Sequence, residues 1–228
     1  ANDARGTAQR VDPADPQRAV SSVKPLVRTQ GEEIGLRSEW LPGWKSTLAL
    51  WQLRMASELL FVGDAGTTEP SRPSRRRGVE WSHFVALNPH WAIDADWTWS
   101  QARFTDADPA GPYIPGAAST TANLGLSWDG QGPWFGAMRL RYWGARPLVE
   151  DNSLRSPAAA WVNLRVGYRI SARDQWALDV YNLMDRKVDD IAYAYVSRLP
   201  GEAAQGLMDR HLHPAEPRTW RLRWMHKF

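Results

Sequence analysis

The sequence predicts an all-β fold, an antiparallel up-and-down transmembrane β-barrel of which about nine strands are present. Three observations predict it. Apolar and polar residues alternate with a period of two, and the connections between these segments are short and long in turn. The third observation is the 14 Trp residues among 228, which lie close to the segment ends. Trp prefers a site with one apolar and one wet side, such as a membrane interface.

The nine strands are expected, in chain order, at residues 30–40, 45–54, 75–87, 90–104, 118–128, 133–144, 159–170, 174–184 and 216–228. Four short turns join the first eight in pairs: Leu41-Pro42-Gly43, Asn88-Pro89, Asp129-Gly130-Gln131-Gly132 and Ser171-Ala172-Arg173. Long connections rich in Pro, Gly, Asp and Arg cover about 55–74, 105–117, 145–158 and 185–215. This alternation of short turns and long connections is typical of an up-and-down meander.

The alternation itself is clearest in the later strands. At 91–99, Trp91, Ile93 and Trp97 share one face, opposite Asp94 and Asp96. The segments 122–128, 138–142, 162–170 and 176–181 repeat this pattern, and so does the last strand. No long segment shows a helical stripe, so the chain is predicted to consist of strands that are apolar on one face only.

All short turns would lie on one rim and all long loops on the other, as in outer-membrane barrels with short periplasmic turns and long extracellular loops. Residues 1–29 would form an extracellular loop or disordered lead-in, and residues 30–228 the barrel portion. In lipid every backbone polar group must be paired, so a spanning sheet must close. Bacterial single-chain barrels have even strand numbers, so nine strands indicate a miscount or part of a larger barrel.

Composition excludes several function classes. Apolar residues make up 43% and charged residues 23%, as in folded chains. No run of about 18 apolar residues predicts a transmembrane helix, and residues 1–10 lack the apolar centre of a signal peptide. The absence of Cys excludes disulfides, thiolate metal sites and iron–sulfur clusters. The net charge of +3, spread over interspersed charges, argues against a nucleic-acid partner.

The Trp positions predict two aromatic belts. The belt beside the short turns, an aromatic girdle, consists of Trp40, Trp44, Trp91, Trp128, Trp134 and Trp176. The belt near the long loops would consist of Trp51, Trp143, Trp161 and Trp220. Such belts are typical of both bilayer interfaces. The alternative is a soluble β-sandwich binding module with Trp in its core.

Charged residues share the polar face of the strands and are expected to face the lumen, because a charge facing lipid at mid-depth is costly. The lumen-facing set consists of Asp94, Asp96, Arg139, Arg141, Arg165, Arg169, Asp179, Arg221 and Arg223. They would line either a ligand path or a water-filled wall of mixed charge.

A basic run lies at the long-loop end of one strand: Arg72, Arg75, Arg76 and Arg77. We expect it at the outer rim, near lipopolysaccharide phosphates, which Arg binds well. The loop cluster of Asp209, His211, His213 and Glu216 has no fixed ligand spacing, so no metal site is predicted. No catalytic or cofactor-binding motif is present, and neither an enzyme nor a cofactor is predicted.

Several segments resemble the C-terminal part of TonB-dependent outer-membrane receptors. Residues 180–187, Val-Tyr-Asn-Leu-Met-Asp-Arg-Lys, are similar to the family's V-x-N-L-F-D-K/R-x stretch, with Met184 where Phe is usual. Residues 217–228 resemble its terminal strand closing on Phe. Weaker likenesses occur at 31–37, 77–80 and 113–117, so the resemblance runs from about residue 24 to 228.

The resemblance implies a 22-stranded barrel in the outer membrane of a Gram-negative bacterium, enclosing an N-terminal plug that the TonB complex pulls. Nothing here resembles the plug, and at about 10 residues per strand 228 residues cannot supply 22 strands. The nine strands would be the last nine. The implied function is TonB-dependent uptake of a scarce ligand such as a siderophore-type iron chelate. The alternatives are a truncated remnant without transport and a passive pore.

The resemblance also implies an assembly signal in the last strand, read by the barrel-assembly machinery. Its residues are Trp220, Leu222, Trp224 and Phe228. An exposed edge strand can pair with a strand of another protein, and such strand addition would be the mechanism by which the assembly machinery recognises the signal. The alternative is an ordinary last strand.

Overall fold

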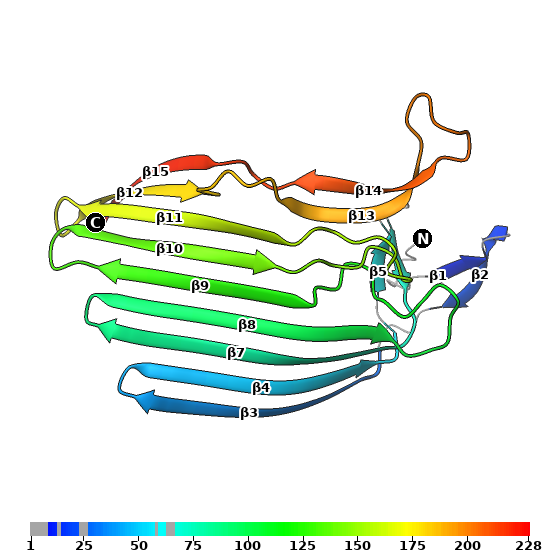
Figure 1. The fold of residues 1–228 in the computed structure, drawn as a ribbon, viewed down its shortest axis with the longest axis horizontal. Helices are drawn as coiled ribbons and strands as arrows, with labels where there is room; N and C mark the ends of the chain where they lie inside the picture. The colour runs from blue at the N-terminus through cyan, green and yellow to red at the C-terminus, as the bar shows by residue number, and fades with distance from the viewer. Residues whose placement is uncertain (1–8, 13–14, 23–26, 58, 63–66) are drawn as a thin grey trace.

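Nine antiparallel strands form one sheet in the computed structural model, which describes residues 9–12, 15–22, 27–57, 59–62 and 67–228 (Figure 1). From edge to edge they are β3 (Thr29–Leu41), β4 (Trp44–Met55), β7 (Ser74–Asn88), β8 (Trp91–Phe104), β9 (Thr120–Asp129), β10 (Trp134–Trp143), β11 (Ala159–Arg169), β12 (Asp174–Tyr181) and β15 (Thr219–His226). The nine predicted strands are confirmed, and no strand end is displaced by more than three residues.

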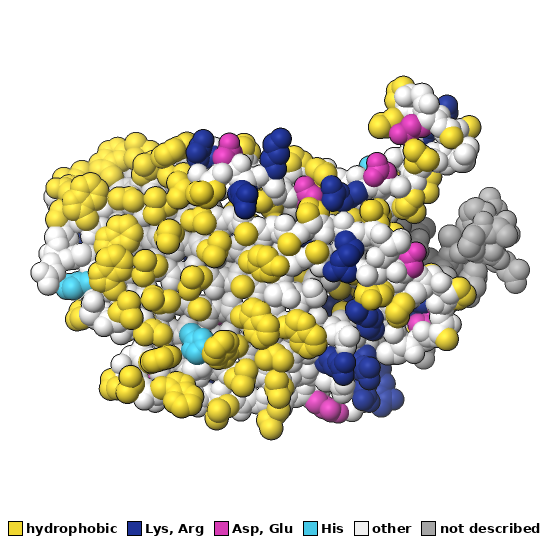
Figure 2. All heavy atoms as spheres, in the orientation of Figure 1, with side chains coloured by type: hydrophobic (Ala, Val, Ile, Leu, Met, Phe, Trp, Pro, Cys, Tyr) yellow, Lys and Arg dark blue, Asp and Glu magenta, His cyan; other side chains and the backbone are white. Residues whose placement is uncertain are grey.

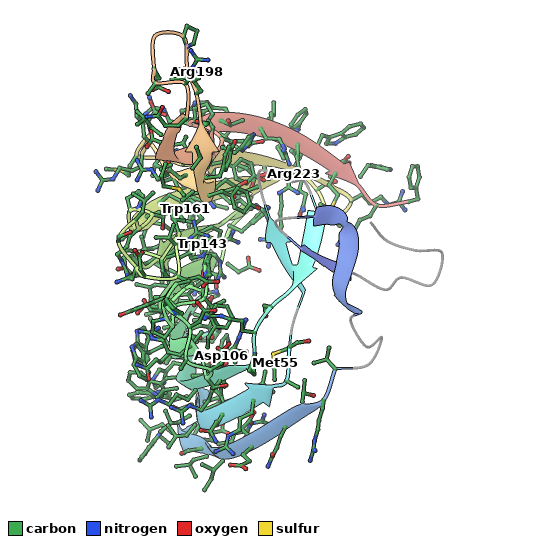
Figure 3. All side chains as sticks on the ribbon, turned by 90° about the vertical axis from the view of Figure 1, so that its right-hand side faces the viewer. Met55, Asp106, Trp143, Trp161, Arg198 and Arg223 are labelled. Carbon is green, nitrogen blue, oxygen red and sulfur yellow. The ribbon has the colours of Figure 1, made fainter. Side chains whose placement is uncertain are left out.

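The sheet is an open trough. Figure 1 places the short turns and the C-terminus at one end and the long connections at the other. Seen along the strands, the sheet curves without closing (Figure 3). Strands β3 and β15 are its two edges, and they do not pair with each other in the described part of the chain. The fold is therefore a partial, unclosed barrel, which accounts for the odd strand number.

Three hairpins were not predicted. β5 (Leu59–Val62) pairs with β6 (Thr67–Pro70), and β13 (Asp189–Ser197) pairs with β14 (Leu207–Pro214), inside segments expected to be loops. β1 (Gln9–Asp12) and β2 (Asp15–Ser22) pair within the expected lead-in. In β13 both faces carry apolar residues, so the strand lacks the apolar–polar contrast that revealed the others. The division of the chain at residues 29 and 30 stays a prediction.

The strand register aligns the apolar faces across the whole sheet. Leu140 of β10 lies opposite Leu124 of β9 and Val162 of β11, and Leu178 of β12 lies opposite Leu222 of β15. A slip of one residue would turn every side chain of a strand to the other face. The shared apolar face covers the strands (Figure 2). Among the described residues, no helix has the length and apolar character needed to cross a membrane.

The apolar face is exposed, so the soluble β-sandwich alternative is wrong. All nine long strands lie in a single sheet, and each of the other sheets in the described residues has only two strands. Large side chains on the face remain accessible, for example Leu222 at 65%. An apolar surface of this extent indicates a membrane or a partner. The buried cluster is small and lies near the long-loop rim, around Ala102, Phe104 and Ile114.

The register places five of the six Trp residues predicted for the short-turn belt on the apolar face, near the short-turn ends of their strands: Trp44, Trp91, Trp128, Trp134 and Trp176. The sixth, Trp40, lies at a register irregularity of β3 beside the first short turn and is exposed. Several of their rings pack across neighbouring strands. Trp91 stacks on Trp128 with centroids 5.8 Å apart, and Trp134 meets Tyr168 edge-on at 4.9 Å. Aromatic pairs of this kind add to the stability of adjacent strands.

The second Trp belt was predicted wrongly for three of its four members. Trp51, Trp143 and Trp161 lie near the long-loop rim, but the register turns them to the polar face, where Trp161 is opposite Arg141. Trp143 and Trp161 pack edge-on with centroids 5.2 Å apart, and Figure 3 labels both. Only Trp220 lies on the apolar face. The prediction used position along the strand and ignored which face each Trp occupies.

Gly136 in β10 provides a test of this packing. A Cβ at Gly136 would lie 2.1 Å from the ring of Trp128 and 2.5 Å from the backbone oxygen of Arg165. Gly136→Ala should therefore lower the stability of the folded protein by about 1–3 kcal/mol, because the strands must move apart. The measurement is the midpoint temperature of heat-modified gel migration in detergent. Gly132→Ala is the control, since no atom lies within 4 Å of its added methyl. Equal midpoints would contradict the packing.

Candidate functional site

The polar face carries every charged residue predicted to face the lumen. The strand register places all nine on the side opposite the apolar face: Asp94, Asp96, Arg139, Arg141, Arg165, Arg169, Asp179, Arg221 and Arg223. This face is the concave side of the trough. What the alternation did not reveal is how these charges pair, because pairing depends on the register between strands.

Asp94 and Arg139 form an ion pair across an intervening strand. Asp94 on β8 and Arg139 on β10 both lie opposite Gly125 of β9. Two guanidinium nitrogens of Arg139 donate to the two carboxylate oxygens of Asp94, at 2.8 and 3.1 Å. A Cβ on Gly125 would lie 2.3 Å from the Asp94 carboxylate. The missing side chain of Gly125 therefore permits this contact over two strand spacings.

Asp179 joins three strands. Its carboxylate is 2.6 Å from Nε of Arg165 on β11 and 2.8 Å from Nη2 of Arg223 on β15. The Asp179 side chain is only 5% exposed, while both arginines remain partly accessible. A buried carboxylate with two cations is well compensated, and losing it would leave two guanidinium groups facing each other. Asp179 thus helps to hold the last strand in register.

The rest of the polar face is a wall of mixed charge. Arg169 pairs with Asp129 at 2.7 Å, and the Arg221 guanidinium lies 5.2 Å from the ring centre of Tyr181. Asp96 and Arg141 are exposed. Such a face can hold water, ions or a polar protein surface. In the described residues, no group of three or more His, Asp or Glu side chains could hold a metal ion. His211 of the predicted loop cluster stacks on Tyr195, with centroids 3.7 Å apart.

The structure separates the four arginines of the basic run. Arg72 precedes β7 and is 13% exposed, within 3.7 Å of Asp106, 3.3 Å of Asp108 and 3.2 Å of Glu150. It also lies 4.1 Å above the Phe104 ring. Arg72 therefore ties the long loops together. Carboxylates surround Arg72, and the expected contact with lipopolysaccharide stays a prediction.

The other three arginines alternate between the two faces of β7. Arg76 pairs with Leu53 and Ala102 in the register and lies on the polar face, so it too does not belong to the outer-facing set. Arg75 and Arg77 lie on the apolar side, at the long-loop end. The run does not act as one group, because Pro73 and Ser74 separate Arg72 from the other three arginines and a strand turns successive residues to opposite faces.

A tight turn orders the long loop that carries Glu150. The backbone N–H and the hydroxyl of Ser153 donate to Asp151 at 2.9 and 2.7 Å. These two hydrogen bonds, the backbone one first, hold the pKa of Asp151 below its usual value. The carboxylate thus stays ionised in mildly acidic solution, and the turn beside the Arg72 cluster is kept.

The C-terminal strand presents an open edge. Among the strands that the structure describes, β15 pairs with β12 alone, and Trp220, Leu222 and Trp224 are 61–65% exposed on its apolar face. Phe228 follows the strand and is fully exposed, with its ring 5.0 Å from that of His226. At the same rim, Trp224 Nε1 and His226 Nδ1 both contact Asp174, at 3.1 and 2.9 Å. This edge is available for pairing with another strand.

A curved antiparallel sheet with one apolar face, one charged face and long connections at a single rim defines part of an outer-membrane β-barrel. The family model for the TonB dependent receptor-like β-barrel matches residues 18–183. The chain belongs to this family, whose members are receptors and transporters in the outer membrane of Gram-negative bacteria. The recognised resemblance is therefore confirmed.

Among curated proteins, the chain is 26% identical over 191 residues to the "Catecholate siderophore receptor Fiu" of Escherichia coli (strain K12). This match covers 77% of the chain and 22% of Fiu. The chain thus spans about a fifth of that relative's length.

Solved structures of this class share the fold at lower identity. The closed form of Fiu from E. coli K12 superimposes with a TM-score of 0.65 at 22% identity, covering 96% of the chain and 30% of Fiu. The ferric yersiniabactin uptake receptor FyuA of Yersinia pestis gives 0.71 at 18% identity, covering 97% of the chain and 33% of FyuA.

Asp179→Asn tests the three-strand ion cluster. Neutralising the carboxylate leaves Arg165 and Arg223 without their shared anion, so we expect a loss of about 2 kcal/mol in stability. The measurement is again the heat-modification midpoint. Asp96→Asn removes the same charge from an exposed site on the same face and should change the midpoint little. Equal shifts in both variants would show that total charge matters and that the cluster does not.

Proposed function

We propose that the chain is the C-terminal portion of an outer-membrane receptor that imports a scarce ligand such as a siderophore-type iron chelate. The match of the family barrel model over residues 18–183 carries this proposal. Relatives described as receptors for ferric catecholates, ferric yersiniabactin and ferric citrate support the ligand class. The ligand itself is left open, because the long loops contain no recognised binding motif.

In this proposal the polar face lines a hydrated lumen. The ion pairs Asp94–Arg139 and Asp129–Arg169 balance part of its charge, while exposed groups such as Asp96 and Arg141 are available to water or to a plug. Coupling to the TonB complex would run only through a plug supplied by another part of the protein. The outer rim would adjoin lipopolysaccharide, and the short-turn Trp girdle would lie at the inner interface.

The first test is whether the reading frame upstream of residue 1 encodes a plug and a TonB-contacting box. The protein including that region is then expressed in a strain lacking its own iron-chelate receptors. We expect uptake of one labelled iron chelate from a panel that includes catecholates, and loss of that uptake in a strain without TonB. An upstream region without a plug, or uptake that is independent of TonB, would contradict the proposal.

The same strains distinguish two alternatives, a passive pore and a truncated remnant, because each predicts a different result. A passive pore would admit small hydrophilic solutes regardless of TonB, as measured by antibiotic sensitivity or liposome swelling. A truncated remnant would show neither uptake nor leakage.

Phe228 is predicted to act in assembly. Deleting Phe228 should reduce outer-membrane insertion of the intact protein several-fold, because the fully exposed terminal ring next to an open edge strand is available to the barrel-assembly machinery. Insertion is measured by fractionation and heat-modifiable migration. Met225→Leu, an apolar exchange in the same strand, is the control. Unchanged insertion after deletion of Phe228 would remove its role as a signal.

A further inference from the structure

The carboxylate of Asp174 joins a short turn to the end of the chain. Its Oδ1 accepts a hydrogen bond from Nε1 of Trp224 at 3.1 Å, and Nδ1 of His226 lies 2.9 Å from the same oxygen. Its Oδ2 accepts a hydrogen bond from the hydroxyl of Ser171 at 3.2 Å. Asp174 is the first residue of β12, whereas Trp224 and His226 belong to β15. These contacts can therefore form only when the two strands are paired.

The turn before β12 holds this carboxylate in place. The hydroxyl of Ser171 accepts hydrogen bonds from the backbone N–H groups of Arg173 and Asp174, at 3.1 and 3.0 Å. Beyond the last residue of β15, the N–H of Lys227 donates to the carbonyl oxygen of Arg173 at 2.9 Å. The end of the chain, which Figure 1 shows beside the short turns, is thus fastened to the turn by backbone and side-chain contacts together.

The aromatic rings at this end of the sheet form a continuous series. Trp176 of β12 stacks on Trp224 with centroids 6.3 Å apart, and the ring of Trp224 lies 6.0 Å from that of His226. Phe228 meets His226 edge-on at 5.0 Å. Trp224 and Phe228 are both residues of the expected assembly signal. The signal is therefore connected to β12 through side chains as well as through the backbone.

We propose that Asp174 is a latch residue, one whose contacts with the last strand release the chain from the barrel-assembly machinery. Before β15 pairs with β12, the side chains of Trp224 and His226 are free to contact a machinery that binds the last strand by strand addition. Once the strands pair, the Asp174 carboxylate holds both side chains on β12, and a charged acceptor makes such hydrogen bonds stronger than neutral ones. Recognition and release thus compete for the same side chains. The inference rests on the proposed assembly of the chain in the outer membrane.

The test follows the intact protein on the assembly machinery in living cells. A photoreactive amino acid in place of Met225, carried by every variant, crosslinks the last strand to the machinery during a pulse-chase. In Asp174→Ala we expect the crosslinked species to form as in the wild type and to decay about fivefold more slowly, as the net loss of roughly one hydrogen bond predicts. Decay at the wild-type rate would overturn the latch, and so would a smaller initial amount of crosslinked species.

A second variant tests the direct contact between the two strands. Trp224→Phe keeps an aromatic ring in the signal and removes the indole N–H, so slower decay should recur. Asp174→Ala/Trp224→Phe should decay no more slowly than Asp174→Ala, because both changes remove the same hydrogen bond. Additive slowing would refute the direct contact.

A matched control separates the latch from a general loss of stability. Asp129→Ala removes a carboxylate at another short turn, where it pairs with Arg169 at 2.7 Å. We expect this variant to lower the heat-modification midpoint and to leave the decay rate unchanged. Slow decay in Asp129→Ala as well would show that any destabilised barrel is released late, which overturns the specific role of Asp174.

The wild type separates this inference from the proposed function. A wild-type protein that neither crosslinks to the machinery nor reaches the outer membrane refutes the proposed function. An inserted wild-type protein whose crosslinked species decays as fast as that of Asp174→Ala refutes the latch alone.

Discussion

The structure depends on one constraint, which is that backbone N–H and C=O groups in hydrocarbon must be paired inside the protein. A sheet meets this requirement strand by strand, and the short turns together with the alternation of apolar and polar side chains set the register of the strands. The register then decides which face each residue occupies. The apolar surface, the ion pairs of the polar face and the contacts of Asp174 with β15 are all consequences of that pairing.

Local patterns were sufficient to predict the strands and turns, because alternation and turn residues are properties of short segments. The faces of Asp94, Arg139 and Asp179 followed from the same alternation. Their pairing could not be predicted, since it requires knowing that Gly125 lies between two of them and that β15 returns beside β12. Three of the Trp residues near the long loops were assigned to the wrong face, because position near a rim does not determine which face of the sheet a side chain occupies. The β13–β14 hairpin was not predicted because β13 carries apolar residues on both faces.

Glycine has a recurring role on the polar face of this sheet. Where β9 carries Gly125, the Asp94 carboxylate extends over the strand toward β10; where β11 carries Gly167, the Phe135 ring occupies the space that a Cβ would fill. In each case a large side chain covers the neighbouring backbone and shields its hydrogen bonds. Over Gly125, the contact between Asp94 and Arg139 thereby links β8 to β10 in addition to the backbone ladder.

The two free edges bear on how long such a protein persists once it is assembled. In a closed barrel every strand has two paired neighbours. A strand can therefore detach only by exposing two rows of polar backbone groups to hydrocarbon, whereas an edge strand of an open sheet exposes one. In a complete barrel, pairing of β15 with the first strand would close the ring and so slow unfolding. The lifetime of the folded protein in the membrane would then depend on the rate at which this strand pair opens, more than on the equilibrium free energy of unfolding. A sheet whose edge strands β3 and β15 are unpaired lacks this kinetic barrier.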